Sequence, residues 1–509
     1  MLRLTPFVLL LTPWATPLKA QTFTSNSYLP LEHRAMPFLE YLVARGVMAD
    51  PSPMVRPWTV GAVVRKLNAA DTNGLSAAER STVRELRAAL DPARGEAVLA
   101  VEAQAAVRAA THARREPLRE AGPRKVYPLG ELHVALQFGP GVLATYPVAD
   151  PRALKWDPDF TGRRDEATAS RWESAYAAYR TRYLDVAFGT VSRNWGPPEL
   201  PSAIVSPVPY SYDHLFVRAG PERIHLEALV THLDDFPGPG VPIRRYWVVH
   251  RVAVRPLAWM DVAPWQATLL SGPARGLEIW YLNPLKYANA AGDEENVGGN
   301  ALIGMDVETR LGNGRRVGVS LMIDDVQTVG LSTDDEPPSY ALTLTTTGPL
   351  AGGIGSLAYT QVANLTYRTP DPSEAVMRRG IGLGRNFSDY DQATARTSWL
   401  FAPGVLLGAE ATLLRQGEGD FRLPFPDTSQ YDVTPRLFAG VVERTLRAAG
   451  NAHLRFGPHL ALEADAGLHR VSNADHVVGR RRTRFVGSIS LKYRFGGSWL
   501  LSQDSANNR

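Results

Sequence analysis

The chain has 509 residues, of which 44% are hydrophobic and 21% charged, so its composition is that of a folded protein and excludes extensive disorder. A net charge of +4 without a long basic stripe excludes a typical nucleic-acid-binding protein. After the N-terminus no uncharged apolar run approaches about 18 residues, which excludes a multi-spanning helical membrane protein. The mean hydropathy of −0.17 still permits a transmembrane β-barrel, because barrel strands alternate polar and apolar residues.

Residues 1–20 are predicted to be a cleavable secretory signal peptide. Arg3 supplies the positive charge, residues 7–11 form a short apolar core, and Ala20 is a small residue suited to cleavage. The chain contains no cysteine, which excludes a lipid anchor and a disulfide framework. We therefore expect an exported protein that is stabilised by a large core or by a membrane.

Residues 21–95 are predicted to form a small module of three amphipathic helices. Apolar residues recur at helical spacing in 36–47, 60–67 and 76–90. Thr59 can cap the second helix, and Ser76 with Glu79 forms a capping box that opens the third. Because short helices in fewer than about 80 residues make a marginal bundle, this module needs a surface to pack on.

From about Glu96 to Phe495 the hydrophobic period changes to two residues, which is typical of strands with one apolar face. Strand lengths of roughly 9 to 13 residues suit a tilted crossing of a bilayer. Short turns such as 312–314 alternate with long connections such as 368–391, as periplasmic turns and extracellular loops do in outer-membrane barrels. The sequence thus predicts one barrel over 96–495 and a C-terminal tail over 496–509.

Eighteen antiparallel strands are predicted, an even number as is usual for such barrels. Sixteen is the alternative, because 97–113 is rich in alanine and could be a helix. A soluble β-sandwich or propeller is less favoured, since no repeat of about 40 residues is present. The predicted strands cover 97–113, 127–138, 141–147, 172–180, 184–193, 215–219, 223–232, 244–255, 263–271, 299–311, 315–323, 340–347, 354–367, 392–401, 405–415, 436–446, 459–471 and 484–495.

Four short strings stand out along the chain, namely 31–42 (LEHRAMPFLEYL), 193–198 (RNWGPP), 300–306 (NALIGMD) and 380–384 (GIGLG). They resemble segments of the capsule assembly Wzi family. The resemblance implies an eighteen-stranded outer-membrane barrel whose periplasmic end is closed by the helical module. It also implies a surface lectin that holds exported capsular polysaccharide. Separately, Tyr493-Arg494-Phe495 resembles the terminal aromatic signal that barrel-insertion machinery reads.

The sequence carries no strong signature of catalysis. It contains no Gly-x-Ser-x-Gly elbow, no His-Glu-x-x-His and no phosphate-binding loop, so we expect no enzyme and no cofactor. The acidic runs 324–325 and 334–336 could hold Ca²⁺ but lack EF-hand spacing, and solvated loops are the favoured interpretation. Likewise His225, His232 and His250 could form a cluster in the lumen, although hydrogen-bonded lumen residues are the simpler interpretation.

Aromatic residues in the long loops are the candidate polysaccharide contacts, because sugar rings stack on aromatic faces while their hydroxyls need polar partners. The alternative is that these aromatics form the membrane-interface girdle or pack the loops. Arg193, Asn194 and Trp195 could equally position a ligand or brace the barrel mouth. The candidate ligand-binding residues are Trp156, Arg193, Asn194, Trp195, Tyr210, Tyr212, Trp280, Tyr281, Asn283, Asp293 and Tyr431.

The predicted function is a monomeric, non-enzymatic outer-membrane protein that binds and retains capsular or extracellular polysaccharide at the cell surface. Its other expected partners are outer-membrane lipid and the barrel-insertion machinery. A porin-like or export-associated channel is the first alternative, and an outer-membrane hydrolase is the second.

Overall fold

The computed structural model describes residues 22–116, 118–164, 171–284, 286, 299–312, 314–324 and 339–502. The predicted signal peptide, Asp293 and the acidic run 334–336 lie outside these residues, so their predictions are not addressed by the structure.

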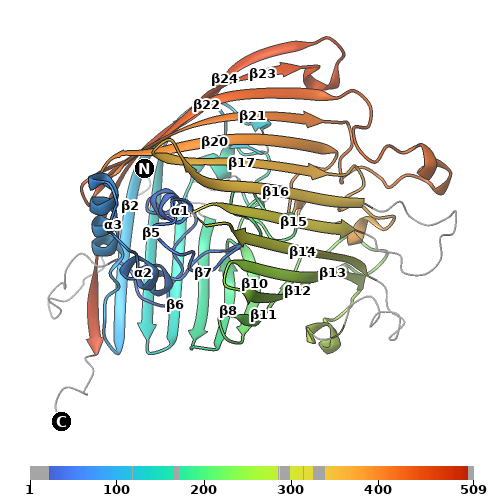
Figure 1. Cartoon of the computed structure of the whole chain (residues 1–509). Helices are drawn as coiled ribbons and strands as arrows, with labels where there is room; N and C mark the ends of the chain where they lie inside the picture. The colour runs from blue at the N-terminus through green and yellow to red at the C-terminus, as the bar shows by residue number, and fades with distance from the viewer. Residues whose placement is uncertain are drawn as a thin grey trace, which may run out of the picture.

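Eighteen antiparallel strands of the described chain close into one barrel (Figure 1). The first and last of them pair over their whole shared length, from Ala97 opposite Ser502 to Ala110 opposite Ser488. The prediction of eighteen strands is therefore confirmed, and the alanine-rich segment is a strand. The barrel strands are β2 (Ala97–Ala110), β5 (Lys125–Phe138), β6 (Gly141–Ala149), β7 (Arg171–Arg180), β8 (Leu184–Val191), β10 (Tyr212–Ala219), β11 (Ile224–His232), β12 (Ile243–Leu257), β13 (Met260–Pro273), β14 (Asn300–Arg310), β15 (Arg316–Asp324), β16 (Ser339–Leu350), β17 (Gly353–Val362), β20 (Tyr390–Ala402), β21 (Val405–Gln416), β22 (Glu443–Phe456), β23 (Leu460–Ser472) and β24 (Arg481–Ser502).

Two predicted boundaries near the C-terminus are wrong. The strand expected over 436–446 is β22, which begins only at Glu443, because Phe438 and Gly440 have φ angles of 67° and 62° that extended chain does not adopt. Residues 447–456, which the prediction left between the strands 436–446 and 459–471, belong to β22. The final strand continues to Ser502, so most of the expected tail from residue 496 extends the barrel wall.

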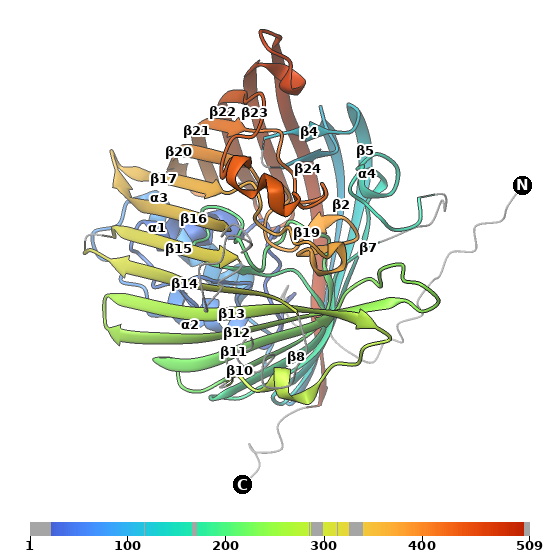
Figure 2. The ribbon, with the colours of Figure 1, turned by 90° about the vertical axis from the view of Figure 1, so that its right-hand side faces the viewer.

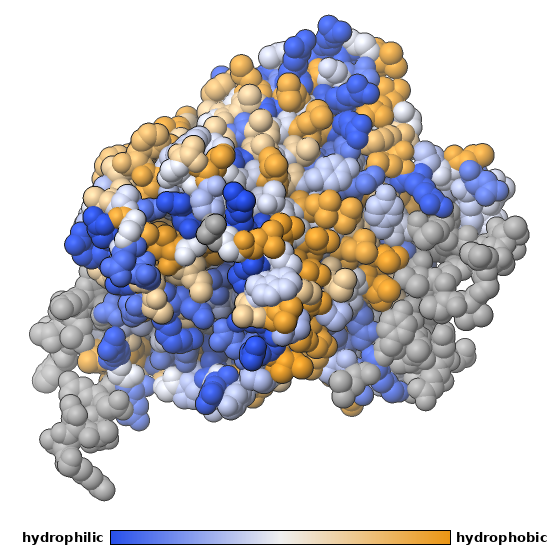
Figure 3. All heavy atoms as spheres, viewed as in Figure 1, coloured by the Kyte–Doolittle hydropathy of each residue, from blue (hydrophilic) through white to orange (hydrophobic). Residues whose placement is uncertain are grey.

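Short turns lie at one end of the barrel and long connections at the other, as predicted (Figure 1). The turns at 139–140, 351–352 and 403–404 each join neighbouring strands by two residues. Along the strands, alternate side chains face outward and are exposed and apolar, for example Phe485, Ile489 and Phe495 on β24. The hydrophobic outer wall and the hydrophilic end beside the helices are visible in Figure 3.

The N-terminal helices are α1 (Met36–Ala44), α2 (Val60–Asn68) and α3 (Ala77–Leu90). Thr59 caps α2 by accepting a hydrogen bond from the Ala62 amide, and Ser76 with Glu79 makes the predicted capping box of α3. Their apolar faces share one core, which also includes Leu406 of the barrel wall. In the described chain, no helix has both the length and the apolar character needed to span a membrane.

The helical module closes the end of the barrel that bears the short turns. The Arg34 guanidinium donates to the Pro458 carbonyl at 2.6 Å, and the Asn26 side chain donates to the carbonyls at 139 and 140. Gly46 lies so close to the turn at Gly314 that a Cβ on Gly46 would be 3.1 Å from the Gly314 Cα, and a Cβ on Gly314 would be 3.0 Å from the Arg45 carbonyl oxygen. Because the module contacts several different turns around the rim, it spans the mouth of the barrel and is not attached at one side alone.

Candidate functional site

Connections from the opposite end of the barrel fold inward and occupy the lumen (Figure 2). The connection 192–211 begins with β9 (Asn194–Trp195), which pairs with β1 (Val55–Arg56) of the helical module. Further along, Glu199 accepts a hydrogen bond from Thr347 at 2.6 Å, and Ser206 donates to the Leu383 carbonyl. This connection thus crosses the lumen from β8 to the far wall.

The long connection 363–389, which carries β18 (Met377–Arg378) and β19 (Ile381–Gly382), also turns inward. The fully buried Arg245 of β12 holds it by donating to the carbonyls of Ser373 at 2.5 Å, Ala375 at 2.6 Å and Met377 at 3.0 Å. From the same connection Arg385 donates to the hydroxyl of Thr343 on β16 at 3.2 Å. Protein thus fills much of the lumen from both ends.

Ion pairs line the inner wall around these connections. Arg251 binds Glu227 at 2.7 Å, and all of this pair is buried. On the other side, Arg447 binds Glu410 at 3.1 Å and Asp465 at 2.6 Å. Such pairs satisfy charges that face inward in strands whose other face is apolar.

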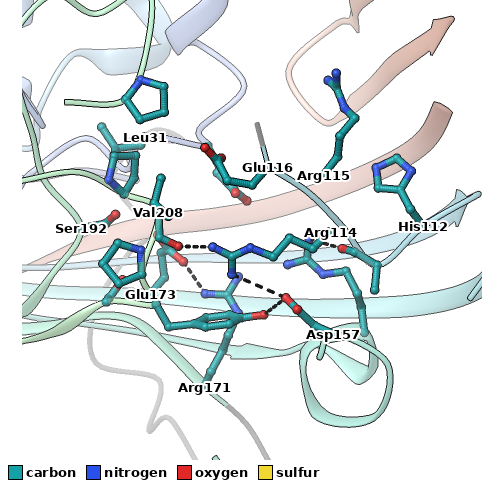
Figure 4. Close-up of a pocket in the computed structure, with 18 of the residues that line it drawn as sticks. Leu31, His112, Arg114, Arg115, Glu116, Asp157, Arg171, Glu173, Ser192 and Val208 are labelled. Carbon is teal, nitrogen blue, oxygen red and sulfur yellow. Dashed lines mark hydrogen bonds and ion pairs between the residues drawn. The ribbon is translucent and has the colours of Figure 1, made fainter. Parts of the chain in front are cut away.

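A cavity of about 400 Å³ remains between the inward connections and the wall formed by β2, β7, β23 and β24 (Figure 4). This volume falls in the range of about 300–1,000 Å³ that is typical of small-molecule sites. Three prolines, Pro201, Pro207 and Pro209, stiffen one side, and charged residues line most of the rest. The lining residues are Leu31, Glu32, Arg108, His112, Ala113, Arg114, Arg115, Glu116, Arg152, Asp157, Arg171, Glu173, Ser192, Pro201, Pro207, Val208, Pro209, Tyr210, Ser211, Asp465 and Ser488.

Tyr210 is the predicted ligand-binding residue that lines this cavity. Two guanidinium groups lie near its ring, that of Arg114 at 5.7 Å and that of Arg171 at 5.6 Å from the ring centre. Its hydroxyl donates to Asp157 at 2.5 Å, and Asp157 also faces Arg114, at 3.8 Å. Figure 4 shows Arg114, Asp157 and Arg171 converging at this point. The aromatic face is therefore held rigidly among charged groups.

The charges of the cavity are set by burial and by its arginines. Burial lowers the pKa of His112 to about 4, with Arg115 and Arg108 contributing in the same direction, so this imidazole is neutral at pH 7. Burial also raises the pKa of Glu116. Glu32 lies deep in the barrel but exposes its side chain to the cavity. Burial raises the pKa of this carboxyl group, but the nearby charges of Arg171 and Arg152 lower it more, so that the pKa lies below its ordinary value.

The cavity offers donors from arginines, acceptors from carboxylates and apolar proline and tyrosine surfaces. A sugar presents hydroxyl groups around its rim and apolar C–H faces, so this lining fits a carbohydrate better than a purely apolar ligand. Among the described residues no group of three or more acidic or histidine side chains could hold a metal ion.

The structure places three predicted ligand contacts where a surface polymer has no access to them. Arg193, Asn194 and Trp195 are all buried, and Trp195 is 0% exposed. Arg193 donates to His214 at 2.7 Å, and Asn194 accepts from the Ser202 amide at 2.8 Å. These contacts favour the bracing alternative over the ligand-binding one. Tyr212 is also buried, against His214.

Trp280 and Tyr281 lie on the outside of the barrel. They stack on each other at 3.6 Å in the turn η1 (Ile279–Leu282) and pack against Val248 and Leu270. Val248 pairs with Val230, which shares the outward face of β11 with the exposed Ile224. This position fits the alternative of a membrane-interface girdle.

The remaining candidates do not gather into one site. Asn283 is exposed just after η1. Trp156 contacts Tyr127 beside the cavity, and Tyr431, which lies in η3 (Thr428–Val433), contacts Phe425. The three histidines also fail to cluster, because His225 approaches Glu227 at 3.5 Å, whereas His232 and His250 lie at the alternate, outward positions of their strands.

Sequence reasoning missed most of the cavity. Residues 112–116 fold inward, and Arg114 and Glu116 line the site. The signal for them was the density of charge in 112–120 (HARREPLRE), which is unusual for a loop that only joins two strands. Glu32 lies in the string 31–42, but no ligand-binding role was predicted for it from the sequence.

A closed eighteen-stranded barrel with an apolar outer wall, a helical module across one mouth and connections folded into its lumen defines an occluded outer-membrane type of barrel. Its fold is similar to that of Wzi, an outer-membrane protein involved in group 1 capsule assembly in Escherichia coli and described as a carbohydrate-binding β-barrel. The two share 11% identity over 92% of this chain and 99% of Wzi, with a TM-score of 0.65. The predicted resemblance is thus confirmed at the level of the fold.

Other solved barrels are less similar. OpdQ and OprD of Pseudomonas aeruginosa each share 10% identity over 79% of this chain, covering 98% and 94% of their own, with TM-scores of 0.41 and 0.44. No family model and no curated protein matches the sequence.

Proposed function

We propose that this protein is a non-enzymatic outer-membrane protein that binds and retains exported polysaccharide at the cell surface. The proposal includes export by a signal peptide over residues 1–20, insertion by the barrel machinery, and a helical module at the periplasmic mouth. The proposal takes a single closed barrel as the functional unit.

The occluded lumen is the observation that carries the proposal. A diffusion channel needs a continuous water-filled path, whereas here β1 and β9 pair across the lumen and Arg245 ties a second connection inside it. Rigid, preorganised walls are what a binding site requires, because they reduce the entropy lost when a ligand is ordered. The fold similarity to a carbohydrate-binding barrel supports the same choice.

We assign the polysaccharide contact to the 400 Å³ cavity and to the loops above it. The cavity holds one or two sugar units, with Tyr210 as the apolar platform and Glu32 as an acceptor for hydroxyl groups. The longer polymer then continues over the loop-bearing end.

A glycan array probed with the detergent-purified protein tests this function. We expect selective binding to a set of polysaccharides, and a weaker signal for Glu32→Gln, which changes a carboxylate in the cavity without removing a structural ion pair. Asp71→Asn is the matched control, since Asp71 is an exposed carboxylate of the helical module. No binding to any acidic or neutral glycan would contradict the proposal, as would ohmic conductance of the pure protein in planar bilayers.

A cellular measurement separates retention from simple binding. A strain that lacks the protein is expected to release more polysaccharide into the medium, with its total synthesis unchanged. Equal release by the two strains would contradict a role in retention even if the purified protein binds glycans.

A further inference from the structure

The outer wall carries a group of arginines that the proposed function does not use. Arg444 of β22 lies opposite Ser472 of β23, which in turn lies opposite Arg481 of β24. One row closer to the barrel centre, Arg470 lies between Leu446 and Thr483. We call Arg444, Arg470 and Arg481 the outer arginine group.

These arginines point away from the lumen. Directly paired residues on adjacent antiparallel strands share one face, and every second residue along a strand does so as well. Leu446, Leu468 and Phe485, at alternate positions below the group, are exposed hydrophobic residues of the outer wall. The arginines continue the same outward rows and are themselves exposed.

Their height coincides with the boundary of the apolar belt. On the outward face of β24, the exposed aromatic residues Phe485 and Phe495 stand ten residues apart, as the two aromatic girdles of such a barrel do at the edges of its apolar band. Ten residue steps cover about 34 Å along a strand, or about 26 Å along the barrel axis at a tilt of about 40°. That height matches the apolar band of about 25 Å in such barrels, so Arg481, four residues above Phe485, lies at the level of the lipid headgroups.

The positive charge of the group is unbalanced in the described part of the chain. Arg444, Arg470 and Arg481 make no side-chain ion pair or hydrogen bond with another described residue. By contrast, Arg415, opposite Arg444, is paired with Asp391 at 2.5 Å. Nearby Arg480 and Arg482 share Asp475. Hydrophilic side chains cover the tips of β22–β24 at the top of Figure 3.

We propose that the outer arginine group binds the phosphate groups of a phosphorylated glycolipid in the outer leaflet of the membrane. A ligand that touches all three arginines also covers the apolar residues Leu446, Leu468 and Phe485. An amphiphile fits this arrangement, because its anionic headgroup can bind the arginines while its acyl chains cover the apolar residues. A soluble acidic polysaccharide would satisfy the charges but leave the apolar rows uncovered. Guanidinium groups match phosphate oxygens by bidentate, charge-assisted hydrogen bonds.

Native mass spectrometry of the intact protein in detergent tests this lipid site. The probes are bis-phosphorylated lipid A and the same lipid after removal of both phosphates. We expect the triple variant R444Q/R470Q/R481Q to bind the phosphorylated lipid at least roughly tenfold more weakly than wild type, because three charge-assisted contacts are lost. The dephosphorylated lipid should bind wild type and variant equally weakly.

Two controls separate this effect from misfolding and from net charge. The variant R444K/R470K/R481K keeps the charge and should keep at least part of the affinity. R80Q/R84Q/R94Q removes the same charge from exposed positions near the helical module and should bind the phosphorylated lipid as wild type does. Heat-modifiable gel mobility reports whether each barrel is folded.

Several results would overturn the lipid site. They are equal affinity of wild type for both lipids, equal losses in the two glutamine variants, or binding of soluble polygalacturonate that needs the outer arginine group. None of these measurements depends on the polysaccharide cavity, so the lipid site and the proposed function fail or stand separately.

Discussion

The junction between the helical module and the inward connection depends on one buried arginine, Arg56. Its guanidinium binds Glu40 at 2.7 Å and Asp50 at 3.0 Å and lies 3.9 Å above the ring of Trp58. Arg56 itself is in β1, opposite Asn194 of β9. We predict that Arg56→Met weakens the docking of the module, because it leaves two carboxylates without their main partner.

The size of the effect follows from how deeply each partner is buried. Breaking a buried ion pair costs about 3–5 kcal/mol. The side chain of Glu40 is 31% exposed and recovers water, while Asp50 keeps the Trp58 indole at 3.1 Å and Arg316 at 3.9 Å. The lower end, about 3 kcal/mol, is therefore expected, which raises the undocked population of the module roughly a hundredfold.

Urea unfolding in lipid vesicles and limited proteolysis of the N-terminal module measure this change. Lys66→Met is the matched control, because Lys66 and Glu222 pair at 3.4 Å with side chains 31% and 59% exposed. Such an exposed pair contributes less than about 1 kcal/mol. The double variant Arg56→Met/Asp50→Asn should recover part of the loss, since it removes the stranded charge.

The reasoning fails if Arg56→Met unfolds at the same urea concentration as wild type and resists protease equally. It also fails if the double variant loses the sum of the two single losses, because the carboxylate would then not be the cause.

Three further predictions concern the lumen and the outer wall. Burial lowers the pKa of His112 to about 4 in the folded protein. The neutral imidazole therefore contributes about 3 kcal/mol to the free energy of unfolding above pH 6.5, and this contribution is lost as the pH falls to 4. The urea midpoint of the wild type should drop relative to that of His112→Asn over this window, and parallel curves would contradict the prediction. Arg245→Met removes three hydrogen bonds to carbonyls of the connection 363–389. Hydrogen exchange of the amides in 372–378 should become roughly thirtyfold faster, which is equivalent to about 2 kcal/mol. Unchanged protection would show that other contacts hold this connection. Trp280→Ala, on the outer wall, should leave glycan binding within about twofold of wild type, whereas Tyr210→Ala should weaken it by roughly tenfold, and the reverse order would return the ligand to the outer loops.

The barrel was predictable because the alternation of polar and apolar residues within each strand indicates which side chains face the lumen and which face outward. Odd residues of 485–495 are apolar, and the structure exposes Phe485, Ile489 and Phe495 on the outer wall. The error at β22 has a local cause, since small residues such as Ala449 and Gly450 carry no hydropathy contrast and resemble a turn. Loop residues could not fix the true start, which depends on the positive φ angles at Phe438 and Gly440.

The candidate site was far less predictable, because it forms from segments that meet only in the folded barrel. Nothing near Trp195 indicates that it pairs with Val55 inside the lumen. The same holds for Arg114 and Tyr210, whose contact joins two different loops. Aromatic content alone also could not distinguish Tyr210 in the cavity from Trp280 on the outer wall, because both side chains are equally suited to a sugar or to a membrane interface.

The seam between β2 and β24 gives the helical module a role in assembly. At this seam Arg494 donates to Glu102 at 2.7 Å, across 392 residues of sequence, and Thr22 donates to the same carboxylate. Joining points so far apart costs about 5 kcal/mol of chain entropy, which must be met when the last strand arrives. Since Thr22 of the N-terminal segment donates to Glu102 of β2, and His33 lies 3.4 Å from the Arg494 guanidinium of β24, a docked module contacts both sides of the seam and holds partners for the first and last strands in place. Barrel closure and sealing of the mouth that bears the short turns thus become one cooperative event, and a chain that closes is one that is already plugged.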